Sequence, residues 1–230
     1  MKKTKLLLIF CISLLIVGIC TSVFAVSTEK YVTTTTINGV TVKWEYYIDK
    51  SNQIIELKCT NPTELNGNVT IPAILDGKTV VSIGSTAFEG STKITEITLP
   101  NTLKEVGAYA FADCTKLAKI NFGTGVETLS VSTFENCTAL TSLSIPKSLI
   151  KDCGNHPFAG CSNITSVSFE NGITEIPAFI CEGLTGIKEI TIPNSAIKIG
   201  AYAFAGCTKL AKINFGTGVQ TIRINAFENC

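Results

Sequence analysis

Short stretches in which apolar and polar residues alternate recur through most of the chain. Each contains an apolar–polar–apolar triplet such as Ile120–Asn121–Phe122, a pattern typical of a β-strand with one buried and one exposed face. Ile120 and Phe122 are therefore expected to point inward and Asn121 outward. The six clearest stretches are Ile94–Pro100, Leu117–Phe122, Leu140–Pro146, Ile164–Phe169, Ile187–Pro193 and Leu210–Phe215.

Phenylalanine recurs in a constant local setting, as in STAFEGS, AYAFADC and VSTFENC. The spacings are 23, 23, 24, 46 and 23 residues, and the interval of 46 hides a degenerate copy with Cys181 at the phenylalanine position. The residues Gly107–Val126 return at Gly200–Val219 with one change, Asp113 to Gly206. Such a period predicts a solenoid with one coil per repeat. The recurring residues are Phe88, Phe111, Phe134, Phe158, Phe204 and Phe227.

A single coil of this size cannot bury its own apolar side chains, so neighbouring coils must stack. Equivalent strands then pair in parallel about 4.8 Å apart, and like residues lie over like inside the solenoid. The phenylalanines are expected to form one inward ladder and the strand isoleucines and leucines another. Pro100, Pro146 and Pro193 should end their strands, because proline cannot donate a hydrogen bond to a sheet.

The pattern L-x-x-I-x-L/I-P followed by I-G-x-x-A-F-x-G/N-C resembles the BspA-like, or Treponema pallidum-type, leucine-rich repeats over residues 68–230. The resemblance implies a right-handed, curved solenoid with a parallel β-sheet on its concave side. It also implies a secreted or surface-displayed bacterial protein, and some members of the family are adhesins. The departures are Cys181 for phenylalanine, Leu184 and Ser91 for cysteine, and an extra residue before Phe158.

The first 25 residues have the features of a signal peptide. Lysines precede an uncharged apolar run from Leu6 to Cys20, and small residues at Val23 and Ala25 predict cleavage after Ala25. A transmembrane anchor is the alternative, but the run is short for a membrane span and no basic cluster follows it. Export to the cell surface or the extracellular space is the expectation.

Residues 26–67 do not repeat and are expected to form a β-hairpin cap over the first coil, since the end of a solenoid needs a cover. Asn38-Gly39 predicts the hairpin turn, and Gln53–Cys59 a third strand. We interpret three aromatic residues here as part of the cap, and the alternative is a binding patch for wall glycans; they are Trp44, Tyr46 and Tyr47. The following stretch, Ile71–Gly84, resembles a first coil lengthened by a turn at Asp76-Gly77.

Charge and composition exclude some classes of partner. Loss of Lys2, Lys3 and Lys5 with the leader leaves 16 basic and 18 acidic residues, a formal charge of −2. There is no basic stripe for a phosphate backbone, so no nucleic-acid partner is expected. The hydrophobic content of 45% and the charged content of 16% argue for a folded chain.

The residues offer little for catalysis or for binding a metal or cofactor. His156 is the sole histidine, and no serine or cysteine lies in a known nucleophile setting. Cys153, His156 and Cys161 are the one metal-like arrangement, but a zinc site needs about four ligands. We interpret this segment as a bulged turn, and we expect no cofactor and no enzyme activity.

Five cysteines occupy one repeat position and are expected to be buried thiols, because each has a packing role as a small apolar group. Export would normally favour disulfides. The off-pattern Cys59, Cys153 and Cys181 are the better candidates for reactivity, although the sequence does not pair them. The repeat-position cysteines are Cys114, Cys137, Cys161, Cys207 and Cys230.

The outward strand residues form the candidate binding surface, rich in hydroxyls and without aromatic rings, which favours a protein ligand over sugars. We expect a protein–protein interaction or adhesion module; the alternative is a structural spacer that displays another domain. The coil ending at Cys230 lacks its strand, which predicts a fragment or self-association through the open coil. The candidate residues are Thr95, Glu96, Thr98, Lys119, Asn121, Thr141, Ser142, Ser144, Thr165, Ser166, Ser168, Lys188, Glu189, Thr191, Lys212 and Asn214.

Overall fold

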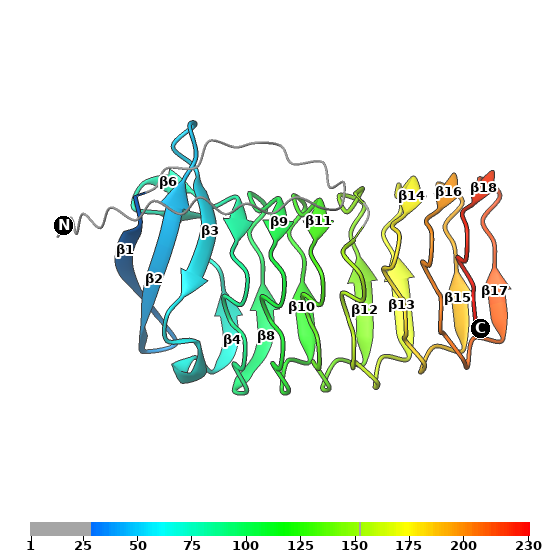
Figure 1. Ribbon diagram of the computed structural model, residues 1–230, viewed down its shortest axis with the longest axis horizontal. Coiled ribbons are helices and arrows are strands. Elements are labelled where there is room, and N and C mark those ends of the chain that lie inside the picture. The colour runs from blue at the N-terminus through cyan, green and yellow to red at the C-terminus, as the bar shows by residue number, and fades with distance from the viewer. Residues whose placement is uncertain (1–28, 152) are drawn as a thin grey trace, which may run out of the picture.

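The computed structural model describes residues 29–151 and 153–230, which form a β-solenoid of about seven coils stacked along one axis (Figure 1). The repeat solenoid predicted from the sequence is confirmed. The predicted signal peptide, residues 1–25, lies outside the described residues. Within the described residues, no helix has the length and apolar character needed to cross a membrane.

Each coil contributes a strand to one side of the solenoid, here called the strand face. Because equal repeat lengths put equivalent residues side by side, the strands pair in parallel, as Lys119 does with Glu96 and Lys212 with Glu189. They form three ladders, β4–β8–β10, β12–β13 and β15–β17. The strands are β4 (Gly67–Thr70), β8 (Ile94–Thr98), β10 (Lys119–Asn121), β12 (Ser142–Ile145), β13 (Ser166–Phe169), β15 (Glu189–Thr191) and β17 (Lys212–Asn214).

A second side is made of two-residue strands and is here called the short-strand face. Pairing is again parallel, for example Glu105 with Ser82 and Lys198 with Glu175. Two ladders result, β7–β9–β11 and β14–β16–β18. These strands are β7 (Ser82–Ile83), β9 (Glu105–Val106), β11 (Thr128–Leu129), β14 (Glu175–Ile176), β16 (Lys198–Ile199) and β18 (Thr221–Ile222).

After each short strand the chain turns back along a third side, the turn face. Its N–H groups donate to carbonyls of the next coil, as Phe88 does to Ala110 at 2.7 Å and Phe111 to Thr133 at 2.8 Å. Every coil carries two residues with positive φ here. The first row is Thr86, Tyr109, Ser132, His156, Phe179, Tyr202 and Asn225. The second row is Gly90, Asp113, Asn136, Gly160, Gly183, Gly206 and Asn229.

The phenylalanine ladder predicted from the sequence forms the centre of the core. Phe88 and Phe111 stack with ring centroids 4.9 Å apart and 5° between planes, and the stack continues through Phe134 and Phe158. Trp44 covers its first ring at 6.0 Å in an edge-to-face contact. At roughly 1.5–3 kcal/mol for each large apolar side chain buried, this ladder is a main source of stability.

The repeat cysteines run beside the phenylalanines. Cys114 Sγ donates to the carbonyl of Phe88 at 3.3 Å, and Cys137 Sγ donates to that of Phe111 at 3.2 Å. Cys161, Cys207 and Cys230 make the same bond one coil back, at 3.1–3.2 Å. Each thiol thus satisfies a buried carbonyl of the preceding coil.

The first three strands form the N-terminal cap, in blue in Figure 1. β1 (Tyr31–Ile37) and β2 (Val40–Ile48) are antiparallel, and Asn38-Gly39 makes the turn with φ of 50° and 77°, as predicted. β3 (Ile54–Cys59) pairs with both β2 and β7, giving a six-stranded sheet β1–β2–β3–β7–β9–β11. The cap and the first coils therefore share one sheet.

Two small elements complete the first coil. A 3₁₀ turn, η1 (Pro62–Glu64), links the cap to β4. β5 (Ile74–Leu75) and β6 (Lys78–Thr79) form the short hairpin expected at Asp76-Gly77. Here Asp76 has φ of 49° and Gly77 of 70°.

Candidate binding surfaces

All sixteen predicted residues lie on the strand face or directly before its strands, and all are exposed or half-buried. Register brings them together in pairs across neighbouring coils. Asn121 lies beside Thr98, Ser166 beside Ser142, and Asn214 beside Thr191. The chain thus builds one polar surface from residues that are far apart in the sequence.

The two ends of this surface carry the same group of four hydrogen-bonded side chains. Lys119 Nζ lies 2.9 Å from Glu96 Oε1, and Asn121 Nδ2 donates to Glu96 Oε1 at 2.5 Å and to Thr98 Oγ1 at 3.1 Å. The bonds from Lys119 and Asn121 lower the pKa of Glu96. Most of the hydrogen-bonding capacity of this group is already used.

The second group lies 93 residues further along the chain and has the same contacts. Lys212 Nζ and Asn214 Nδ2 both lie 2.6 Å from Glu189 Oε1, and Asn214 Nδ2 donates to Thr191 Oγ1 at 3.2 Å. Lys212 and Asn214 likewise lower the pKa of Glu189. The repeated sequence therefore produces a repeated geometry.

Between these groups lies a centre with unused hydroxyls, on β12 and β13. Ser168 Oγ donates to the carbonyl of Leu143 at 3.3 Å. Five other hydroxyls make no side-chain hydrogen bond to any described residue, and all five are exposed. They can each donate and accept a bond from a ligand. These residues are Thr141, Ser142, Ser144, Thr165 and Ser166.

A second surface, which the sequence did not predict, is a groove of about 970 Å³ where the cap meets the short-strand face. Its floor includes Gly84 and Gly107, and a Cβ on Gly107 would lie 2.7 Å from the backbone of Gly84. Tyr47 and Lys58 of the cap line it as well. The absence of side chains at the two glycines keeps this floor low.

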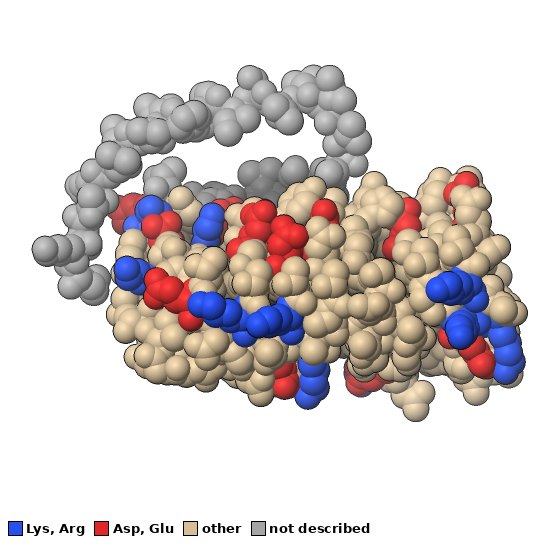
Figure 2. All heavy atoms as spheres, turned by 90° about the horizontal axis from the view of Figure 1, so that it is seen from below, with Lys and Arg blue, Asp and Glu red and all other residues tan. Residues whose placement is uncertain are grey.

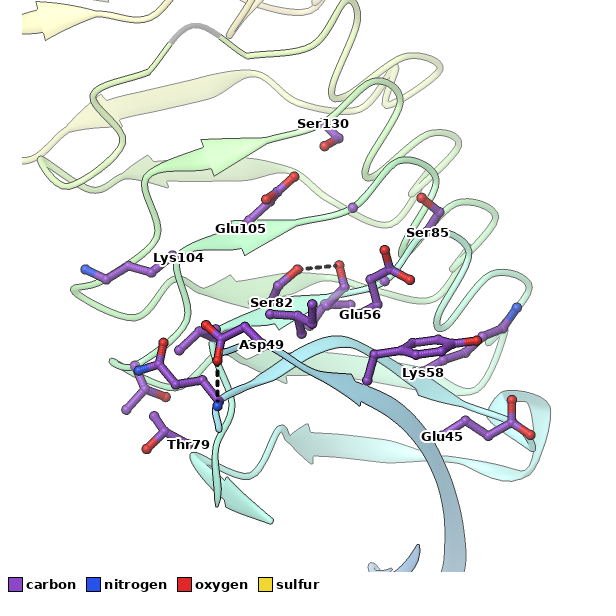
Figure 3. A pocket seen from close by; sticks show the side chains of 18 of the residues that line it. Glu45, Asp49, Glu56, Lys58, Thr79, Ser82, Ser85, Lys104, Glu105 and Ser130 are labelled. Carbon is purple, nitrogen blue, oxygen red and sulfur yellow. Dashed lines mark hydrogen bonds between the residues drawn. The ribbon is translucent and has the colours of Figure 1, made fainter. Parts of the chain in front are cut away.

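The groove is lined by charges of both signs. Glu56 and Glu105 lie on either side of Ser82 (Figure 3), and their carboxylates make no hydrogen bond or ion pair to any described residue. Glu45 is paired with Lys30 at 3.0 Å. Glu56 has φ of 52° at a β-bulge in β3, and such bulges re-aim side chains.

The interpretation of the cap aromatics as a glycan-binding patch is wrong for two of the three. Trp44 is 0% exposed and Tyr46 is 1% exposed. Trp44 Nε1 donates to Thr35 Oγ1 at 2.8 Å, and Tyr46 Oη donates to Asp76 Oδ2 at 2.7 Å. Burial, aided by the bond to Asp76, raises the pKa of Tyr46. These two side chains belong to the core.

The expectation that the off-pattern cysteines are the more reactive is also corrected. Cys59, Cys153 and Cys181 are thiols with at most 5% exposure, as buried as four of the five ladder cysteines; the fifth, Cys230, was expected to be buried and is exposed at the last described coil. Burial raises the pKa of Cys59 to about 11 and also raises that of Cys181. Since the thiolate is the reactive form, we expect burial to slow the reactions of Cys59 and Cys181. Cys230 is the exposed cysteine among the described residues.

Among the described residues, Cys153, His156 and Cys161 are not brought together as metal ligands. No group of three or more potential ligands comes together in residues 29–151 and 153–230. Cys161 Sγ instead donates to the carbonyl of Phe134, and His156 Nδ1 lies 3.2 Å from Glu182 Oε2.

Sequence reasoning also missed a row of exposed aromatic side chains on the turn face. Tyr109 is 40% exposed, the side chain of His156 is 54% exposed, and Phe179 and Tyr202 are half-buried. Phe179 and Tyr202 stack at 5.3 Å with 6° between their planes. The signal was present in the sequence, because these residues lie two positions before the ladder position.

Charged side chains are sparse and mixed in sign on the face shown in Figure 2, where acidic and basic residues lie next to each other among uncharged ones. Ion pairs between neighbouring coils have the same mixed character: Lys104 and Lys151 lie 3.0 and 3.2 Å from the two carboxylate oxygens of Glu127. This arrangement gives no broad field of one sign to attract a highly charged polymer.

Comparison with known proteins agrees with the geometry. The family model of the BspA-type leucine-rich repeat region, in six copies, matches residues 53–185 and 174–230. No curated protein matches the chain in sequence.

Two solved structures show the relation in three dimensions. The leucine-rich repeat protein of T. pallidum is 23% identical, with a TM-score of 0.66, over 81% of this chain and 86% of that one. A leucine-rich cell surface protein of Faecalibacterium prausnitzii is 19% identical, with a TM-score of 0.52. That match covers 82% of this chain and 55% of the other. At these identities, the similarity concerns the fold.

Proposed function

This chain belongs to the BspA-type leucine-rich repeat proteins, and we propose that it is exported and binds a protein on another cell or in the surrounding matrix. The fold is that of a protein-interaction module, built from repeats that give an extended surface. We place the contact on the strand face and centre it on β12 and β13. The F. prausnitzii cell surface protein of the same fold supports a location outside the cell.

The unused hydroxyls of β12 and β13 carry this proposal. They lie on or directly before two strands that pair in parallel, with Ser142 opposite Ser166, so the ladder fixes their backbone. A ligand that binds here therefore does not have to order the strands first. The hydroxyls can form a wide set of weak, partly water-mediated contacts, which suits a protein surface better than a small molecule.

The two groups around Glu96 and Glu189 frame this centre. Their side chains are held by one another, so we expect them to position the edges of a partner and to contribute less to affinity. Exposed ion pairs of this kind contribute roughly 0–1 kcal/mol. The strongest effect of a substitution is therefore expected between them, near Ser166.

The test is attachment of the labelled, purified protein to immobilised matrix proteins and to epithelial cells. Ser166→Arg places a long charged side chain in the centre and should weaken attachment at least tenfold. The matched control is Ser162→Arg, the same change in the same coil at an exposed residue outside the strands. Equal attachment by the two variants would reject the strand face as the site.

Export has its own test, by fractionation of the source cells and mass spectrometry of the mature N-terminus. The expected product begins after Ala25 and is found outside the cytoplasm. An uncleaved chain confined to the cytoplasm would overturn this part of the proposal. An exported chain that attaches to none of the tested partners would support the spacer alternative.

A further inference from the structure

We infer that the turn face binds a proline-rich segment in the polyproline II conformation, across Tyr109, Ser132 and His156. This surface differs from the strand face, so the inference and the proposed function can fail separately. It rests on three observations: the residue types at the positive-φ positions, the exposure of the rings, and their spacing along the solenoid.

The first observation is a contrast between the two positive-φ rows of the turn face. The second row consists of glycine, asparagine and aspartate, the residues that tolerate this conformation best. The first row has the same backbone requirement, yet it carries Tyr109, His156, Phe179 and Tyr202, with φ between 52° and 62°. Histidine is among the residues enriched in this region, whereas tyrosine and phenylalanine are not. The backbone therefore does not account for Tyr109, Phe179 and Tyr202.

The second observation is that packing does not account for Tyr109 and His156. Their exposed fractions are 40% and 54%, and neither ring stacks on another ring among the described residues. His156 Nδ1 lies 3.2 Å from Glu182 Oε2, an oxygen that has no hydrogen-bond partner in the described part of the chain. Neither imidazole nitrogen makes a hydrogen bond to a described residue, so both can bond to a ligand.

The third observation is the distance between Tyr109 and His156 along the solenoid. Turn hydrogen bonds are regular here, with Tyr109 N–H donating to Val131 at 3.1 Å and Ser132 N–H to Asn155 at 3.2 Å. In the same coils the ladder rings are 5.2 and 5.4 Å apart. Tyr109 and His156 therefore lie about two coils, or about 10 Å, apart, with the small Ser132 between them.

A polyproline II helix repeats every three residues and rises about 3.1 Å per residue, so prolines at i and i+3 lie about 9 Å apart. Two such prolines can pack against Tyr109 and His156 together. The intervening residues then cross the coil of Ser132, whose side chain is small and only 6% exposed and so adds no projecting ring between the two. The ligand's unpaired carbonyls can accept hydrogen bonds from the Tyr109 hydroxyl and from His156. Aromatic surfaces recognise this helix because it is ordered before it binds.

The experiment is a fluorescence anisotropy titration of labelled decaproline with the full chain, using (Gly-Ser)₅ as the control peptide. Binding of decaproline and not of the control is expected. Tyr109→Asn should weaken it at least tenfold, since asparagine tolerates positive φ and removes the ring. Ser132→Tyr should abolish it by filling the space between the rings. Tyr202→Asn, in a later coil, should change the affinity less than twofold.

Circular dichroism and the melting temperature of each variant establish that it is folded, and tyrosine already occupies the equivalent position in two other coils. Failure of the wild-type chain to bind decaproline at millimolar concentration would overturn the inference. So would unchanged binding by Ser132→Tyr. If cellohexaose binds through Tyr109 and decaproline does not, the row is a glycan platform and the inference is wrong.

Discussion

The ring of Phe169 lies edge-on to that of Phe204, with centroids 6.2 Å apart and 86° between the ring planes. In the regular coils, a strand phenylalanine meets the ladder residue twelve positions later, as Phe122 meets Phe134 at 6.0 Å. The residue twelve positions after Phe169 is Cys181. Its small side chain leaves room, and Phe169 reaches past it to the next ladder ring.

The shifted position of the Phe169 ring predicts that substitutions at Cys181 and Phe169 have non-additive effects on the free energy of unfolding. Cys181→Phe alone should lower the free energy of unfolding by about 1–3 kcal/mol, because the added ring meets Phe169 in a filled core. Phe169→Leu combined with Cys181→Phe recreates the pairing of Leu99 with Phe111. The double variant should therefore be more stable than Cys181→Phe in urea denaturation. Strictly additive effects of the two changes would contradict the coupling.

The cap hydrogen bond between Tyr46 and Asp76 predicts a smaller effect. Tyr46→Phe leaves the ring in place and removes a buried hydroxyl bonded at 2.7 Å, which should reduce the free energy of unfolding by about 1 kcal/mol. Tyr47→Phe is the control, because Tyr47 is only half-buried and lines the groove. Equal melting temperatures for the two variants would show that the bond to Asp76 does not stabilise the cap.

Burial of the thiols predicts their labelling. In the protein without residues 1–25, Cys230 should react rapidly with Ellman's reagent and the seven buried cysteines slowly, until urea exposes them. Cys230→Ser should remove the rapid phase. Rapid reaction of two or more thiols in the native Cys230→Ser protein would contradict the burial of the ladder.

The same thiols predict a loss of stability at alkaline pH. Burial raises the pKa of Cys59 to about 11 and that of Cys207 to about 12. A cysteine of the unfolded chain ionises near pH 8.5, so above that pH the unfolded state binds fewer protons than the native state. The free energy of unfolding should therefore fall from about pH 8.5 upward. Cys59→Ala and Cys207→Ala should flatten that fall in urea titrations at pH 8 and 10.

The ion pairs of the strand face predict a loss of stability at acidic pH. The pKa of Glu96 and that of Glu189 are lowered in the native state by Lys119 and Lys212, so their contribution is present above about pH 4.3 and is lost as pH falls. The double variant Lys119→Ala/Lys212→Ala should show a shallower loss of stability between pH 5 and pH 3. An unchanged slope would mean that these exposed pairs contribute nothing measurable.

The solenoid was predictable because its core depends on residues that recur at fixed intervals. Identical residues in identical settings had to lie over one another, and Phe88, Phe111 and Phe134 do so. The contact of Phe169 with Phe204 was not predictable, since it depends on space that the small Cys181 leaves inside the packed coils. Periodicity gives the position of a side chain but not the volume around it.

The candidate surfaces also differ in whether the repeat pattern could predict them. Alternation in the strands correctly gave the outward residues of the strand face, such as Asn121 and Ser166. The groove at Glu56 and Glu105 joins two elements that do not repeat together, the bulged strand β3 and β9. Trp44 was ambiguous for a related reason: an aromatic residue in a strand is buried or exposed according to what covers it.

The interruption near His156 affects how the solenoid carries load. Among the described residues, the regular bonds between turns run as far as the N–H of Asn136 and the carbonyl of Ala159, and they resume with Phe179 and Ala201. One bond, from Cys153 N–H to the carbonyl of Ala178 at 3.3 Å, crosses the interval between them. The short-strand ladders also separate here, between β11 and β14. In a linear array the weakest boundary yields first. A molecule stretched between two surfaces should therefore open first at this coil, before the two flanking halves unfold.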